Sequence, residues 1–73
     1  MMSLASAEKG SDCRVIWMLG EYVEALKAQF NVRENTILYV LQNLSGSVCV
    51  RTPEGRTLGM SPEVSRRIKV VCI

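Results

Sequence analysis

The chain has 73 residues, of which 48% are hydrophobic and 22% charged, with a formal net charge of +2 and no histidine. A chain of this length forms one small domain, residues 1–73, which excludes two large layers with a substrate cleft between them. Without histidine, a Ser-His-Asp triad, a Cys-His dyad and a His-ligated zinc site are excluded. The composition therefore favours a binding or regulatory module over an enzyme.

The first half of the chain predicts a short helical turn, a strand and one clear helix. Ser3–Lys9 is mildly helical and Cys13–Leu19 is rich in β-forming residues. Glu21–Phe30 predicts a helix because its apolar residues recur on one face. Asn31 follows this helix and Asn35 precedes the next strand, and we expect both to adopt the left-handed backbone that asparagine tolerates.

The second half predicts four further strands. Residues 42–47 predict a loop, and Pro53-Glu54-Gly55 predicts the tight turn of a hairpin. Ser61-Pro62-Glu63 is typical of a helix start, with serine as N-cap and proline in the first turn. The predicted strands are Thr36–Leu41, Val48–Thr52, Arg56–Met60 and Lys69–Ile73. A small closed barrel buries one face of all five short strands and leaves no exposed edge, so it is the architecture that we expect.

Cys13, Cys49 and Cys72 are odd in number and widely spaced, so they predict three reduced thiols in a reducing compartment. A metal site that gathers all three thiolates is the alternative. No apolar run approaches the roughly 20 residues of a membrane helix, and the N-terminus lacks a secretory leader. We therefore expect a cytoplasmic protein with no membrane span.

The C-terminal part of the chain carries a positive excess. Between residues 45 and 73, five cations (Arg51, Arg56, Arg66, Arg67 and Lys69) face two anions (Glu54 and Glu63), a net charge of +3. The ordinary interpretation is a solvated surface. The alternative is a weak basic face, in which Arg66-Arg67-x-Lys69 contacts an acidic surface or anionic lipid headgroups.

Residues from Leu4 to about Val70 also follow a pattern in their order and spacing. They are Leu4, Lys9-Gly10, Cys13–Met18, Phe30-Asn31-Val32, Glu34-Asn35, Leu38, Val40, Val48, Val50, Leu58-Gly59-Met60, Val64, Ile68 and Val70. This pattern resembles the FeoA family, small cytoplasmic SH3-like proteins of bacterial ferrous iron uptake. The same domain occurs at the C-terminus of iron-dependent repressors of the DtxR type. Asparagine stands at both places after the helix where the family typically has glycine.

The resemblance implies a mainly β fold, a five-stranded SH3-like barrel with one α-helix inserted after the first strand and a helical turn before the last. It also implies a non-enzymatic accessory protein that binds and modulates the cytoplasmic GTPase part of FeoB, the membrane ferrous iron transporter. No cofactor is expected, and no metal-ligand motif carries over.

Strand alternation indicates where a partner would bind. If Leu38 and Val40 point inward, Ile37, Tyr39 and Leu41 point outward and form an apolar stripe. We expect Tyr39 and Ile37, with Leu44 in the adjacent loop, to contact the partner, because exposed apolar and aromatic residues are typical of interfaces. The alternative is that the helix covers this stripe. Arg33 is the most accessible candidate for an arginine that reaches a phosphate of the partner's nucleotide.

Two other functions remain open at this stage. Small SH3-like barrels also bind nucleic acid, but here the aromatic residues lie in the half of the chain without the positive excess. The other possibility is a stand-alone regulatory domain of a metal-dependent repressor. The single tryptophan, Trp17, is expected to pack in the core or at its rim.

Overall fold

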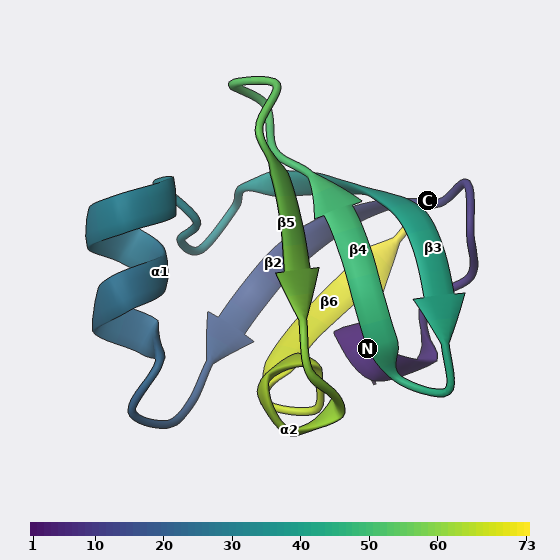
Figure 1. Cartoon of the computed structure of the whole chain (residues 1–73), viewed down its shortest axis with the longest axis horizontal. Helices are drawn as coiled ribbons and strands as arrows, with labels where there is room; N and C mark the ends of the chain where they lie inside the picture. The colour runs from purple at the N-terminus through teal and green to yellow at the C-terminus, as the bar shows by residue number, and fades with distance from the viewer.

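Six antiparallel strands form one sheet in the order β1-β6-β2-β3-β4-β5, with short helical segments around it (Figure 1). The computed structural model describes the whole chain, Met1–Ile73. The elements are β1 (Met2–Ser3), the 3₁₀ helix η1 (Leu4–Ser6), β2 (Asp12–Met18), α1 (Val23–Phe30), β3 (Ile37–Leu44), β4 (Ser47–Arg51), β5 (Thr57–Met60), α2 (Pro62–Ser65) and β6 (Ile68–Cys72). The mainly β class and the five predicted strands are confirmed, and the two-residue β1 is an addition.

Alternation along the strands builds the core. In β2, β3, β4 and β5, buried and more exposed residues alternate at nearly every position, so one face of the sheet turns inward. The core comprises Leu4, Ala7, Cys13, Val15, Met18, Leu26, Val32, Leu38, Val40, Val48, Val50, Leu58, Met60, Ile68 and Val70. Most of these are aliphatic strand residues, so stability depends chiefly on the inner face of the sheet.

The sheet has two ends, and full closure into a barrel is not confirmed. β1 pairs only with β6 and β5 pairs only with β4, so these two strands share no ladder. They have two and four residues, and short edge strands are another way in which natural sheets limit edge pairing. One edge of β5 therefore remains open.

The loop predicted at residues 42–47 is wrong, because β3 continues to Leu44. A register shift between Val40 and Gln42 inserts an extra residue into β3 and changes which residues face outward beyond it. A two-residue turn, Ser45-Gly46, then leads into β4. Their φ angles are +53° and +90°, and positive φ at both central positions is what a type I′ hairpin turn requires.

α1 begins at Val23, two residues later than predicted. Gly20 precedes it with φ +100°, and a Cβ there would lie 2.9 Å from the Arg67 Cδ atom, so this position requires glycine. At the other end, Asn31 and Asn35 have φ of 54° and 75°, which confirms the left-handed backbone predicted for both. None of the helices is long and apolar enough to cross a bilayer.

The prediction of three reduced thiols is wrong for two of them. Cys13 and Cys72 form a disulfide with an S–S distance of 2.01 Å, and Cys49 is the free cysteine. The reason is the antiparallel pairing of β2 with β6, which sets Cys13 directly opposite Cys72. Because 59 residues separate the two cysteines, their spacing in sequence gives no sign of this contact.

We predict that removing this bond by Cys72→Ala destabilises the protein strongly. The bond closes a loop of 59 residues, and constraining so long a loop in the unfolded chain stabilises the native state by about 4 kcal/mol. Urea unfolding of the oxidised protein, the dithiothreitol-treated protein and the variant checks this, and the last two should unfold at similar midpoints. A Cys49→Ala variant that keeps its response to reductant is the control. An oxidised protein whose midpoint does not change on reduction would contradict the prediction.

Candidate functional site

The face of the sheet turned away from the core carries a mixture of apolar, aromatic and charged side chains. We call it the outer sheet face, and it consists of Asp12, Arg14, Trp17, Ile37, Tyr39, Arg51, Lys69 and Val71. These residues come from β2, β3, β4 and β6 and alternate with core residues. Ile37 and Tyr39 are each 38% exposed, which confirms their predicted outward orientation.

Tyr39 lies in the middle of a row of three paired residues. Its Cα partner on β2 is Asp12 and its Cα partner on β4 is Arg51. A shallow depression of ≈ 220 Å³ lies here, lined by Asp12, Ile37, Tyr39, Arg51, Thr52 and Pro53. The tyrosine ring is thus flanked by one carboxylate and one guanidinium, which suits an interface with an apolar centre and a polar rim.

A second row lies beside the first and adds to the positive charge. Arg14 is paired with Ile37 on one side and with Val71 on the other, and Lys69 is the Cα partner of Trp17. The two ion pairs of the protein, Lys27–Glu34 and Arg67–Glu63, lie elsewhere. Arg14, Arg51 and Lys69 are therefore free to attract an acidic partner.

Trp17 does not belong to the core. Its side chain is 36% exposed on the outer sheet face, because the register shift between Val15 and Trp17 turns it outward from β2. The sequence placed the aromatic residues and the positive excess in different halves of the chain. Strand pairing brings Trp17 next to Lys69 and Tyr39 next to Arg51.

Leu44 is more exposed than Tyr39 and Ile37, at 65%. It lies at the far end of β3 from Ile37, next to the Ser45-Gly46 turn. α1 does not cover the stripe formed by Ile37 and Tyr39, because it lies beside β5 instead (Figure 1). The structure therefore brings Tyr39 and Ile37 together and leaves Leu44 apart from them.

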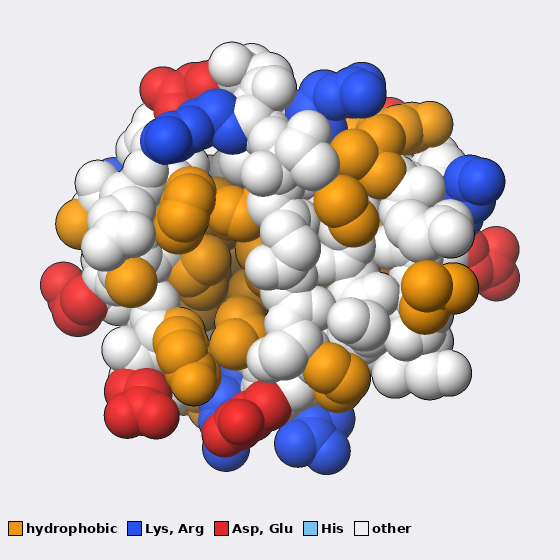
Figure 2. Space-filling view, viewed as in Figure 1, with side chains coloured by type: hydrophobic (Ala, Val, Ile, Leu, Met, Phe, Trp, Pro, Cys, Tyr) orange, Lys and Arg blue, Asp and Glu red, His pale blue; other side chains and the backbone are white.

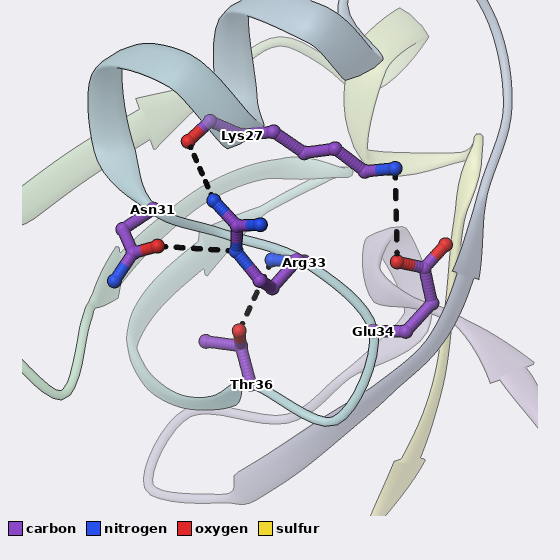
Figure 3. A network of polar contacts seen from close by, with 5 residues as sticks. All are labelled: Lys27, Asn31, Arg33, Glu34 and Thr36. Carbon is purple, nitrogen blue, oxygen red and sulfur yellow. Dashed lines mark hydrogen bonds and ion pairs between the residues drawn. The ribbon is translucent and has the colours of Figure 1, made fainter.

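Arg33 has a structural partner for most of its polar groups (Figure 3). Its Nε–H donates to Asn31 Oδ1 at 3.1 Å, its Nη2–H donates to the Lys27 carbonyl at 3.2 Å, and its backbone N–H donates to Thr36 Oγ1 at 3.0 Å. The Lys27 carbonyl belongs to the last turn of α1, where helix carbonyls lack partners within the helix. Arg33 thus closes the C-terminal end of α1.

An apolar groove separates α1 from β5. It measures ≈ 360 Å³, and its lining includes Tyr22, Ala25, Leu26 and Phe30 on one side and residues 57–61 on the other, with Val64 completing it. Figure 2 shows this recess as a hollow lined by hydrophobic side chains between the helix and β5. One end is closed by Arg56, whose Nη1–H donates to the Gln29 carbonyl at 2.7 Å and whose guanidinium lies 5.4 Å from the centre of the Phe30 ring.

Two polar residues with structural roles were not anticipated. The Asn43 side-chain amide donates to the carbonyls of Ala5 and Ala7 and accepts from the N–H of Gly46, which fastens the N-terminal segment to the β3–β4 hairpin. The fully buried Ser65 hydroxyl donates to the Gly46 carbonyl at 2.6 Å. An asparagine two residues before a Ser-Gly turn is the only sequence signal that could have indicated the first of these.

No group of three or more histidine, cysteine, aspartate or glutamate residues is arranged to hold a metal ion. The disulfide consumes two of the three thiols of the alternative metal site. The outer sheet face and the groove beside α1 both expose apolar side chains and are the candidate binding surfaces.

Comparison with known proteins gives a strong likeness of fold. No protein-family model and no curated protein sequence matches the chain. Among solved structures, the chain is similar to a crystal structure of the iron uptake regulatory protein FeoA, with a TM-score of 0.83 and 15% sequence identity. The match covers 99% of this chain and 97% of the other. The fold is thus FeoA-like over its whole length.

We predict that Arg33→Ala frays the end of α1 without unfolding the protein. Loss of two exposed hydrogen bonds should lower the free energy of unfolding by no more than about 1 kcal/mol, while amide hydrogen exchange near Asn31 becomes severalfold faster. The exposed Arg66, whose side chain makes no hydrogen bond, provides the control variant Arg66→Ala. Unchanged exchange in Arg33→Ala would contradict the structural role.

Proposed function

We propose that this chain is a non-enzymatic accessory protein of bacterial ferrous iron uptake, which acts in the cytoplasm on the GTPase part of a FeoB-type transporter. The observation that carries the proposal is the FeoA-like fold, matched over 99% of the chain. The size of the protein agrees with it. Nearly every buried residue belongs to one core, so a partner must be met on the outside.

The outer sheet face is the surface we assign to this partner. Tyr39 and Ile37 supply the apolar centre, and Arg14, Arg51 and Lys69 supply cations without an ion-pair partner. Such a surface fits a protein with an apolar patch bordered by carboxylates, because complementary charge steers association and suppresses wrong partners. Leu44, at the other end of β3, extends the contact only if the partner is large enough to reach it.

Strand pairing also supports a second candidate function, the binding of single-stranded nucleic acid. The outer sheet face interleaves Trp17 and Tyr39 with three cations, and single-stranded nucleic acid is bound by aromatic rings that stack on bases beside cations that meet phosphates. Retention on heparin and binding to a single-stranded oligonucleotide test this. Affinity that falls steeply with salt would favour it, whereas salt-insensitive or absent binding favours the protein partner.

The Cys13–Cys72 disulfide bears on the proposed action in the cytoplasm. Cytoplasmic thiols are normally kept reduced, so the dithiol form must retain the fold in order to act there. The β2–β6 ladder includes four further residue pairs that do not depend on the sulfur bond, and two of them, Val15–Val70 and Met18–Ile68, join core residues. A proton NMR spectrum of the reduced protein should therefore keep the dispersion of a folded domain.

We predict that Tyr39→Ala weakens binding to the isolated cytoplasmic GTPase domain of the transporter by about tenfold or more, the effect of losing a central aromatic contact. Isothermal titration calorimetry with and without bound nucleotide measures this. Leu19→Ala is the control, since Leu19 is an exposed apolar residue, at 54%, that belongs neither to the outer sheet face nor to the groove beside α1.

Unchanged binding by the Tyr39 variant would contradict the assignment of the outer sheet face to the partner. A folded Tyr39→Ala variant that binds as tightly as the wild type would remove Tyr39 from the interface. In a GTP hydrolysis assay with the same domain, Arg33→Ala should leave the GTPase rate of the partner unchanged, because the guanidinium of Arg33 is already bonded to the end of α1. A lower rate would instead support an arginine that reaches the nucleotide.

A further inference from the structure

The apolar groove between α1 and β5 has a strand edge as one of its walls. β5 is the last strand of the sheet and pairs only with β4. Its residues 57–60 line the groove together with Tyr22, Ala25, Leu26 and Phe30 of the helix side. The wall opposite the helix is therefore backbone as well as side chain.

The register of the β4–β5 hairpin identifies which backbone groups face the groove. The N–H of Thr52 donates to the Arg56 carbonyl at 2.8 Å, and the Cα partners that follow are Arg51 with Thr57, Val50 with Leu58 and Cys49 with Gly59. Hydrogen-bonded and non-hydrogen-bonded pairs alternate along an antiparallel ladder. The N–H and C=O groups of Thr57 and Gly59 therefore point away from β4, toward the open edge.

Gly59 is not explained by the fold. Its φ is not positive, and a Cβ built on it would meet nothing within 4 Å. Glycine in the interior of a strand weakens it, and it often marks a place where another backbone approaches closely. The missing side chain thus leaves room beside the two outward-facing peptide groups.

We propose that this groove binds an extended, uncharged apolar segment of another polypeptide, which adds to β5 as a further strand. The free groups of Thr57 and Gly59 supply main-chain hydrogen bonds. The side chains of Ala25, Leu26 and Phe30 receive alternate apolar residues of the segment. This is β-strand addition, in which the strand edge supplies affinity and the pocket supplies specificity.

The chemistry of the lining specifies this occupant. Arg56 at one end of the groove is bonded to the Gln29 carbonyl, and none of the residues that line the groove is charged, so a charged segment would lose its hydration along the groove without a partner. A helical segment would leave the Thr57 and Gly59 groups without hydrogen bonds, because its own backbone groups are already paired. A second copy of the chain, pairing β5 with β5, would also use these groups, and the test below distinguishes it.

The experiment uses the full-length ¹⁵N-labelled protein and a synthetic pool of decapeptides. Every second position of the peptides is Val, Ile, Leu or Phe, and the other positions are Thr or Ser. The pool is selected on the immobilised protein and the best binder is titrated by NMR. The amide resonances of Thr57 and Gly59 should shift, and their hydrogens should exchange with solvent at least about tenfold more slowly, as newly bonded strand amides do. The same peptide with N-methylated backbone amides should not bind.

Matched variants separate the groove from the rest of α1. Ala25→Glu places a carboxylate in the groove and should weaken peptide binding about tenfold or more, whereas Ala28→Glu, on the exposed side of the same helix, should have no effect. Gly59→Thr should fold normally and bind weakly. The proposal is overturned if no peptide binds, if the N-methylated peptide binds equally well, if the shifts fall on Tyr39 and Ile37 instead, or if sedimentation shows a dimer that protects Thr57 and Gly59 without peptide.

Discussion

The pairing of β2 with β6 is the contact on which the rest of the molecule depends. It joins Cys13 to Cys72 and Val15 to Val70 across almost the whole length of the chain. Bringing such distant segments together carries a large loop-closure entropy, which burial of Val15, Val70 and Ile68 offsets. β1 then has a partner only because β6 is in place, so the N-terminal residues also depend on this pairing.

The alternation of inward and outward side chains along the strands decides where a binding surface can lie. One layer of inward-facing side chains forms the core, and the outward positions are free to vary in chemistry. On β2, β3, β4 and β6 these positions bring three unpaired cations to the same face as Tyr39, Trp17 and Ile37. The outer sheet face thus results from the alternation of side chains along each strand, and its chemical composition depends on which strands are neighbours.

α1 has a different relation to the core. Leu26 is its buried residue, while Arg56 and Arg33 fasten its C-terminal end through the carbonyls of Gln29 and Lys27. A helix held in this way does not close against β5, and an apolar groove remains between the two (Figure 2). The outer sheet face and the groove are separate surfaces, so a protein of this size has the means to meet two segments of a partner at once.

The sequence by itself determined the local structure. Apolar alternation predicted the strands, helical periodicity predicted α1, and Ser61-Pro62 predicted the start of α2, where the serine hydroxyl accepts from the Val64 N–H. The two asparagines in left-handed conformation were predictable because few other residues tolerate that backbone. The outward orientation of Tyr39 and Ile37 followed from period-two alternation alone.

Tertiary structure decided everything that depends on which segments meet. Sequence spacing could not pair Cys13 with Cys72, could not place Trp17 beside Lys69 across a register shift, and could not show that Arg33 bonds to the end of α1. It also could not reveal the open edge of β5, since closure of a sheet depends on the lengths and partners of its last strands. These are long-range contacts, and local propensity carries no information about them because their energy comes from neighbours that the chain brings together only on folding.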